Sequence, residues 1–314
     1  MTIMPSKKIN VVLAGSPSMA IPAFEALWQD SRYNIYGVLT QQDKPAGRGR
    51  KMTPPPVKLW AQSHNLLVWQ PQYLLSWLTT AQEIKPDIIV VMAYGQFVPS
   101  ALLNVPRLGW VNVHGSLLPK YRGAGVLIAP IINGDKETGI SLIQLTKKLD
   151  AGPIIARRII PLSPTETNGS LAAKIANVAA LMLPDTLYQY AQGLLVPQEQ
   201  DDSQSTYVGL IKSQDARINW RKSAKEIERF IRAMQPQPGA WTMLSDNRLK
   251  IIASQVADSA GFKPGQVECV NNQLMVGTGQ GNLIITKLQL AGRSVLSGVE
   301  FLRGHPTIVS AYLY

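Results

Sequence analysis

The chain of 314 residues has a single cysteine, Cys269, and only three histidines. One cysteine excludes an internal disulfide bond and any zinc site that is built from several thiolates. His64, His114 and His305 lie far apart and lack the spacing of a metal-binding motif. We therefore expect no metal, and the scarcity of cysteine is typical of a protein of the reducing cytosol.

Long hydrophobic runs are also missing. No stretch approaches the roughly 18 apolar residues that a membrane-spanning helix requires, and residues 88–93 have the length of a buried strand. Residues 9–15 follow two lysines but soon run into a Gly-Ser-Pro turn, which favours a first strand over a signal peptide. We expect a cytoplasmic protein that does not enter the membrane.

Three common catalytic motifs are absent as well. The turn after the first strand, residues 15–18, reads Gly-Ser-Pro-Ser and lacks the later glycines of a dinucleotide-binding loop. The chain has no phosphate-binding loop of the Gly-x-x-x-x-Gly-Lys type, and Ser116 does not lie in a Gly-x-Ser-x-Gly elbow. These absences argue against a dehydrogenase, a P-loop nucleotidase and a serine hydrolase.

Negative charge is scarce, since the chain has 31 basic and 20 acidic side chains and a net charge of +11. Residues 207–314 hold 13 basic and 7 acidic side chains, a net of +6, whereas the longer stretch 1–206 has a net of +5. A basic excess of this size indicates a polyanionic partner, usually a nucleic acid.

The first 160 residues alternate between strand and helix patterns, which predicts an α/β fold with a mostly parallel sheet. A hairpin at 138–146 and 153–162 is expected to extend this sheet, and a long helix at 168–192 to close the domain. The expected strands are 9–15, 35–40, 67–69, 87–93 and 110–114, and the expected helices are 19–29, 57–64 and 76–83.

The last third has a different pattern. Residues 195–206 are polar and aperiodic, as in a linker between a domain at 1–194 and a domain at 207–314. Ser223 and Glu226 form a capping-box pattern for a helix at 223–234. Short β-like segments at turn-separated intervals then predict a small barrel: 240–244, 249–256, 265–270, 273–278 and 282–290.

The strand predicted at 110–114 ends in polar side chains. Asn112 and His114 are two residues apart and so project from the same face, and strand ends are where open α/β sheets bind ligands. Asp150, which is 36 residues beyond His114, precedes a Gly-Pro turn. An amide, an imidazole and a carboxylate together could polarise a carbonyl and move a proton. The alternative is a hydrogen-bonded core histidine and an ordinary turn, and spacing does not decide between the two.

Residues 41–51 form a loop after a predicted strand, with positive charges at Lys44, Arg48, Arg50 and Lys51. A cationic, glycine-containing loop at this end of the sheet lies on the ligand side. Such charges often belong to a solvated surface loop, which is the alternative interpretation.

Taken together, these motifs resemble those of the methionyl-tRNA formyltransferases over nearly the whole chain. The resemblance is carried by residues 42–49 (Gln-Asp-Lys-Pro-Ala-Gly-Arg-Gly), 93–95 (Ala-Tyr-Gly), 112–119 (Asn-Val-His-Gly-Ser-Leu-Leu-Pro), 121–124, 133–139, 216–220 and 231–233. The sequence departs from the usual pattern of this family at residues 125–128, 145–146 and 151–153, whereas Asp150 is retained.

The resemblance implies a Rossmann-like catalytic domain of the formyltransferase type and an OB-like, basic C-terminal domain that binds tRNA. It implies 10-formyltetrahydrofolate as the formyl donor and initiator methionyl-tRNA as the acceptor, and we expect a monomer. Asn112 and His114 would stabilise the formyl oxygen, while Asp150 would orient His114, favour its cationic form and help to take the proton from the amine. The folate pocket would be lined by Ser116, Leu117, Leu118 and Pro119, and the acceptor stem held by Lys44, Arg48, Arg50 and Lys51.

Two rival hypotheses remain. A folate-dependent formyltransferase that acts on a small amine would use the same three side chains but leave the cationic loop and the basic C-terminal third without a role. An RNA-binding factor on a disabled formyltransferase scaffold would explain the charge but not the intact Asn112, His114 and Asp150.

Overall fold

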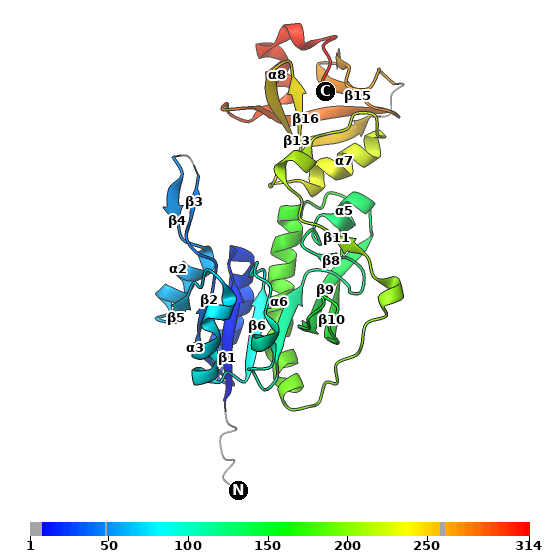
Figure 1. The fold of residues 1–314 in the computed structure, drawn as a ribbon. Coiled ribbons are helices and arrows are strands. Elements are labelled where there is room, and N and C mark those ends of the chain that lie inside the picture. The colour runs from blue at the N-terminus through cyan, green and yellow to red at the C-terminus, as the bar shows by residue number, and fades with distance from the viewer. Residues whose placement is uncertain (1–7, 48, 258–260) are drawn as a thin grey trace. The chain divides into compact units, whose positions relative to one another are not determined.

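The computed structural model describes residues 8–47, 49–257 and 261–314. They fall into two compact units, whose elements are labelled in Figure 1. The first unit comprises the described residues up to Gly123 together with Thr138–Ile160 and Ala172–Tyr207. The second comprises Ala124–Glu137, Pro161–Leu171 and the described residues from Val208 onward.

A seven-stranded sheet forms the centre of the first unit. Its strand order is β10-β9-β7-β6-β1-β2-β5. The strands are β1 (Ile9–Gly15), β2 (Tyr33–Leu39), β5 (Leu67–Trp69), β6 (Ile88–Met92), β7 (Trp110–His114), β9 (Glu137–Gln144) and β10 (Ile154–Pro161). Neighbouring strands from β5 through β2, β1 and β6 to β7 are parallel. Strand β9 runs antiparallel to β7, with His114 opposite Ser141. The predicted mostly parallel sheet is confirmed.

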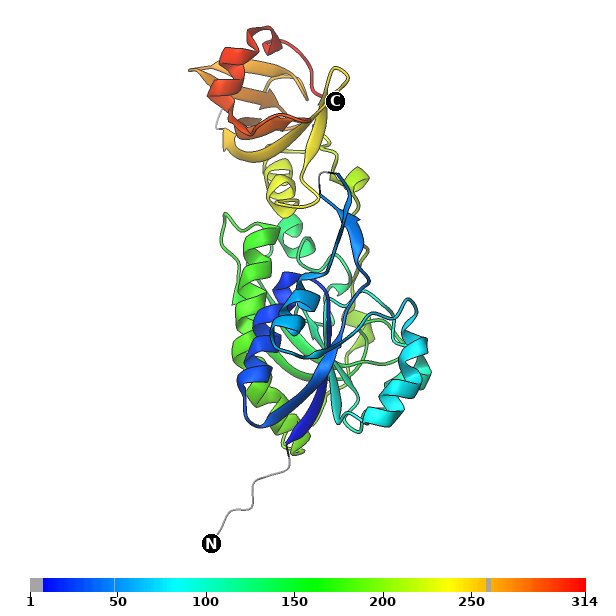
Figure 2. The same cartoon turned by 90° about the vertical axis from the view of Figure 1, so that its left-hand side faces the viewer.

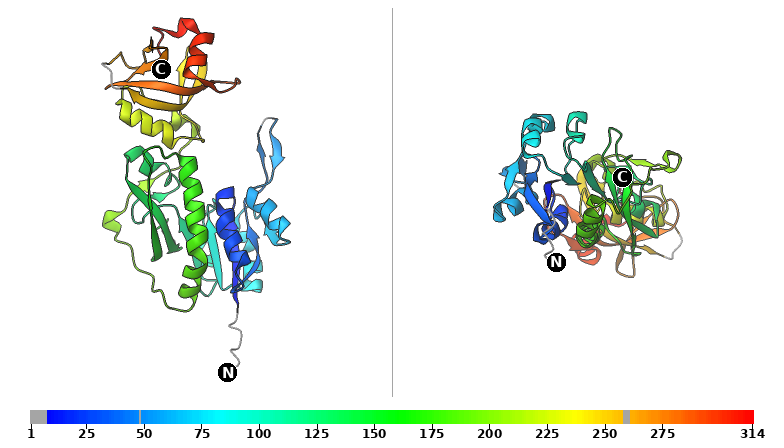
Figure 3. Two further views of the ribbon diagram at one scale, coloured as in Figure 1. Left: turned by 180° about the vertical axis from the view of Figure 1, so that it is seen from behind. Right: turned by 90° about the horizontal axis from the view of Figure 1, so that it is seen from below.

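Helices cover both faces of this sheet. Figures 2 and 3 show α1 (Ile21–Gln29) and α6 (Asn168–Ala191) side by side on one face. The other face is covered by η2 (Leu74–Trp77), α3 (Leu78–Ile84) and α4 (Ser100–Leu103), and α2 (Pro56–Ser63) packs next to β5. Because both faces are buried, β6 is apolar at every position rather than alternating.

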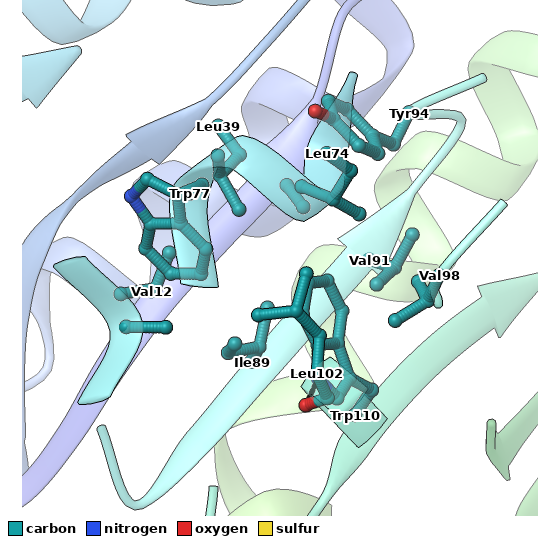
Figure 4. Packing of buried hydrophobic residues seen from close by; sticks show 12 residues of the cluster. Val12, Leu39, Leu74, Trp77, Ile89, Val91, Tyr94, Val98, Leu102 and Trp110 are labelled. Carbon is teal, nitrogen blue, oxygen red and sulfur yellow. Dashed lines mark hydrogen bonds between the residues drawn. The ribbon is translucent and has the colours of Figure 1, made fainter. Parts of the chain in front are cut away.

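The core on the α3 side contains two buried tryptophans, Trp77 of η2 and Trp110 of β7 (Figure 4). Trp110 of β7 is 1% exposed and packs among side chains of β1, β6 and α4. Its indole Nε1 donates a hydrogen bond of 2.8 Å to the carbonyl of Leu102, so its polar atom is satisfied inside the core. This packing fixes the start of β7, the strand that ends at His114.

The second unit contains an antiparallel sheet that curls into a half-barrel (Figure 2). Its strand order is β12-β13-β16-β15-β14. The elements are α7 (Ala224–Ala233), β12 (Trp241–Leu244), β13 (Asn247–Ala257), β14 (Val267–Val270), β15 (Gln273–Gly277), β16 (Asn282–Leu290), β17 (Leu296–Ser297) and α8 (Gly298–Gly304). The predicted small β-barrel after an α/β domain is confirmed.

The N-terminus of α7 has the capping box that its sequence predicts. The backbone N–H of Glu226 donates to Ser223 Oγ at 3.4 Å, and Glu226 Oε2 accepts from the Ser223 N–H at 3.0 Å. The Ser223 hydroxyl also donates to Glu226 Oε2 at 2.7 Å, and this bond is the largest cause of the lowered pKa of the Glu226 carboxyl, followed by the bond from the Ser223 N–H.

Replacing Ser223 by Ala is expected to lower the free energy of unfolding of the second unit by about 1 kcal/mol, because the cap of α7 is lost. Urea unfolding followed by circular dichroism measures this change. Ser223→Thr keeps a hydroxyl at the cap and is the matched control. An equal loss in both variants would show that the cap hydroxyl contributes nothing.

Several short elements were not predicted. They are β3 (Lys44–Ala46), β4 (Lys51–Thr53), β8 (Arg122–Gly123), α4, α5 (Ala129–Asn133), β11 (Tyr207–Val208), β17, α8 and the 3-10 turns η1 (Ser18–Ala20), η2, η3 (Asp202–Gln204), η4 (Ser213–Ala216) and η5 (Pro306–Ile308). Most have two to five residues, too few for a periodic pattern to emerge. For α8 a signal existed, since Ser297 and Glu300 form a second capping box.

Candidate functional site

Three side chains that the sequence placed at the end of β7 and in the Asp150 turn meet in the first unit. The Asn112 Nδ2 donates to Asp150 Oδ1 at 3.4 Å, and the Nδ1 of His114 lies 3.6 Å from the same oxygen. His114 and Asp150 are buried, whereas Asn112 is half-buried. The chain between His114 and Asp150, which are 36 positions apart, therefore folds back and brings the two side chains close together.

The two ring nitrogens of His114 have different partners. Nε2 lies 2.8 Å from the carbonyl oxygen of Tyr121, and because a carbonyl can only accept, Nε2 is the donor. A neutral His114 then carries no hydrogen on Nδ1 and can accept a proton there, next to Asp150. A doubly protonated ring would instead donate from Nδ1. Of the two ring nitrogens, Nδ1 is thus the one that can gain or lose a proton without breaking the bond to Tyr121.

The Asp150 carboxylate is held by a backbone group on its second oxygen. Oδ2 accepts a hydrogen bond of 2.9 Å from the N–H of Gly123. Asp150 itself has φ +49°, a left-handed conformation that residues other than glycine rarely adopt. Such outliers are held by the surrounding structure and cluster at functional sites. Neither Gly123 nor the Tyr121 carbonyl could be recognised from sequence, because both act through the backbone.

The residues predicted to line the folate pocket form the turn after β7. Ser116 is fully buried, and its hydroxyl donates to the carbonyls of Lys120 at 2.7 Å and Tyr121 at 3.1 Å. Leu118 is buried in a small cluster with Ile143 and Ile154. Leu117 and Pro119 are half-buried and are the members of this turn with accessible apolar surface. A role in donor binding stays a prediction for all four.

The cationic loop contains a hairpin, β3 paired with β4, which extends away from the rest of the first unit (Figures 1 and 3). Lys44, Arg50 and Lys51 are exposed on it. Arg48, the fourth predicted tRNA-binding residue, lies outside the described residues. Accessible cations on a projecting hairpin are suited to bind phosphates, as predicted from the sequence.

The base of this hairpin is fixed to the sheet. Asp43 pairs with Lys58 Nζ at 2.8 Å and accepts a hydrogen bond of 2.8 Å from Gln70. Gln70 and Lys58 hold the pKa of the Asp43 carboxyl below its ordinary value. The Gln41 amide donates to the carbonyl of Tyr94 at 3.1 Å, and burial raises the pKa of the Tyr94 hydroxyl to about 12. The hairpin thus projects from an anchored base.

Comparison with known proteins identifies the family. Residues 7–187 match the formyl transferase family, and residues 210–306 match its C-terminal domain. A methionyl-tRNA formyltransferase from Dehalococcoides mccartyi is 41% identical over 301 residues, which cover 95% of each chain. The chain belongs to the methionyl-tRNA formyltransferase family. This confirms the family and the formyltransferase activity that the sequence motifs indicated.

Solved structures share the fold. A methionyl-tRNA formyltransferase from Clostridium thermocellum has a TM-score of 0.59 at 16% identity and covers 92% of this chain and 100% of its own. HypX from Aquifex aeolicus in complex with tetrahydrofolic acid has a TM-score of 0.64 at 16% identity, over 94% of this chain and 47% of that longer one. In the part of the chain that the structure describes, no helix has the length and apolar character to cross a membrane.

Proposed function

We propose that the chain transfers the formyl group of 10-formyltetrahydrofolate to the α-amine of initiator methionyl-tRNA, and that Asn112, His114 and Asp150 carry the reaction. The observation that supports this most directly is the meeting of these three side chains in a member of the formyltransferase family. The donor supplies the formyl group and takes up a proton where that group leaves.

Asn112 stabilises the charge that develops on the formyl oxygen. Its Nδ2 carries two hydrogens, and one points to Asp150 Oδ1, so the other remains for an oxygen of the substrate. Donors that are already in place give the largest stabilisation when charge develops in the transition state. The half-buried position of Asn112 makes this amide accessible, whereas His114 and Asp150 lie deeper.

His114 and Asp150 move the proton. The amine must lose a proton as its nitrogen bonds to the formyl carbon, and the Nδ1–carboxylate pair offers two acceptors 3.6 Å apart. The sequence assigned the His114 imidazole to the formyl oxygen. The Nε2 bond to Tyr121 restricts that role to a doubly protonated ring, which would donate from Nδ1. We assign the general base to Asp150, which is the acceptor of this pair that remains when the ring is doubly protonated.

The acceptor tRNA is bound by the hairpin and by the basic C-terminal part. Lys44, Arg50 and Lys51 provide exposed cations on the hairpin, and we extend this role to Arg48. Residues 207–314 add a net charge of +6. Contacts of this kind position the nucleic acid through its phosphates and carry no sequence information. They leave the choice of the initiator tRNA to other contacts.

The test is a formylation assay with the full chain. With 10-formyltetrahydrofolate and charged initiator tRNA, we expect formyl-methionyl-tRNA, with charged elongator methionyl-tRNA as the control substrate. Product from an amino-sugar nucleotide but not from tRNA would instead support a small-amine formyltransferase. Binding of tRNA without any product would support the RNA-binding factor.

A further inference from the structure

Residues 198–207, here called the return segment, lie against both turns that carry the proposed catalytic groups. Near the Asp150 turn, Gln198 and Ile154 exchange two backbone hydrogen bonds of 2.7 and 2.8 Å. Near the turn after β7, the Tyr121 N–H donates to Thr206 Oγ1 at 2.8 Å, and the Arg122 N–H donates to the Thr206 carbonyl at 2.7 Å. All of these residues belong to the first unit. The return segment therefore bridges the two turns.

Gln200, in the middle of the return segment, binds the backbone of the Asp150 turn. Its Nε2 donates to the carbonyl of Asp150 at 2.8 Å and to the carbonyl of Gly152 at 2.7 Å. Its Oε1 accepts from Arg122 Nη2 at 2.8 Å and from Arg122 Nε at 3.2 Å. The side-chain amide thus uses both of its hydrogens and its oxygen, and its position is defined on each side.

The Asp150 turn needs such support because its backbone is unusual. Asp150 has φ +49°, and a Cβ added to Gly152 would lie 1.8 Å from the carbonyl oxygen of Gln144. The backbone at Asp150 therefore has a left-handed conformation, and Gly152 packs tightly against the backbone of Gln144. Two hydrogen bonds from Gln200 to the carbonyls on either side of Ala151 favour this conformation over relaxed ones.

Arg122 fixes Gln200 from the other turn. Its side chain is 1% exposed and also donates to Asp202 Oδ1 at 2.7 Å and to the Tyr207 hydroxyl at 3.0 Å. Burial tends to lower the pKa of this guanidinium, but its bonds to Tyr207 and Asp202 raise it above the ordinary value. Arg122 follows Tyr121, whose carbonyl accepts from His114 Nε2. The chain of contacts therefore begins beside His114 and ends at Asp150.

We propose that Gln200 and Arg122 are positioning residues, which hold the Asp150 carboxylate against Asn112 and the Nδ1 of His114. This inference rests on the proposed function of Asp150. Neither side chain needs to touch the substrate. Their effect is on distance, because a proton acceptor displaced by about 1 Å can cost on the order of 10²-fold in rate.

The experiment compares Gln200→Met with Gln204→Met. Both replace a glutamine of the return segment by a side chain of similar length, but Gln204 is exposed and its amide donates to Asp201 at 2.8 Å on the surface. We expect kcat for formyl-methionyl-tRNA formation to fall about 10- to 100-fold in Gln200→Met, with both KM values within about threefold of wild type. Gln204→Met is expected to stay within about twofold.

A double variant separates positioning from a loss of stability. If Gln200 acts through Asp150, adding Gln200→Met to Asp150→Asn causes no further loss of kcat, because the group being positioned is already gone. A loss in the double variant equal to the product of the two single losses would overturn the proposal. If Gln200→Met does not fold, Gln200→Glu keeps the oxygen that Arg122 binds, removes the Nε2 donor and is expected to show the same pattern.

Activity of the wild type distinguishes the positioning role of Gln200 from the proposed function. An active wild type with unchanged kcat in Gln200→Met overturns the positioning role and leaves the proposed function in place. A wild type that forms no formyl-methionyl-tRNA overturns the proposed function and the positioning role together.

Discussion

Replacing Asp150 by Asn is expected to lower kcat for formylation by about 10²–10⁴-fold, the range typical of a general base. The substitution keeps the shape of the side chain and an oxygen that can accept the hydrogen bond from the Gly123 N–H, so the turn is expected to keep this contact. What it removes is the negative charge 3.6 Å from the Nδ1 of His114 and the atom that can take a proton. Single-turnover assays with saturating donor and charged tRNA measure the chemical step.

Two further variants define the role of Asp150. Asp185→Asn, an exposed carboxylate on α6 that pairs with Arg32, is the matched control and is expected to be as active as wild type. His114→Ala alone is expected to cost about 10²–10³-fold. If His114 and Asp150 act as a pair, the double variant loses much less than the product of the single losses. Near-normal turnover in His114→Ala would remove this residue from the mechanism.

Removing the three described cations of the hairpin is expected to weaken tRNA binding by about 10²-fold near 0.1 M salt. The change is Lys44→Ala, Arg50→Ala and Lys51→Ala in one protein. Each cation that contacts a phosphate releases counterions when it binds, and contributes about 0.9 to the slope of log K against log salt concentration. The slope is therefore expected to become shallower by about three, as measured by tRNA binding at several salt concentrations.

A control with the same change in net charge distinguishes local contacts from the overall field. Lys147, Arg157 and Arg158 are exposed cations elsewhere in the first unit, and replacing these three by Ala is expected to change the slope much less. Equal effects of the two triple variants would mean that net charge, and not the hairpin, attracts the tRNA. A wild-type affinity independent of salt would contradict the docking proposal as a whole.

Long elements with a clear period could be predicted from sequence. The bounds of β1, β5, β7 and β16 match their predicted ranges, and those of α6 and α7 differ by no more than one residue at either end. Burial of one or both faces imposes a regular pattern on most of these elements. The hairpin in the cationic loop was missed since its strands have three exposed residues each, and an exposed strand has no reason to alternate. Its two described glycines, Gly47 and Gly49, both have positive φ and supply the turn.

The sequence indicated which side chains form the candidate site, but it did not indicate which groups hold them in place. Asn112 and His114 could be placed on one face from their spacing. Asp150 was a candidate partner because of its turn, and the family resemblance favoured that interpretation. The groups that orient them could not be found in this way, because the Tyr121 carbonyl and the Gly123 N–H are backbone atoms. Gln200 lay in a polar stretch without period, where its sequence neighbours gave no sign of a structural role.

The path of the return segment also determines where the reacting centre is completed along the chain. A fragment that ends at residue 194 would carry Asn112, His114 and Asp150 and still lack Gln200 and the partners of Arg122. Because the proposed positioning contacts need residues up to Tyr207, we expect the Asp150 turn to be completed only after Tyr207 has left the ribosome. The smallest piece of this enzyme that contains the proposed centre with these contacts is longer than the piece that contains its proposed catalytic residues.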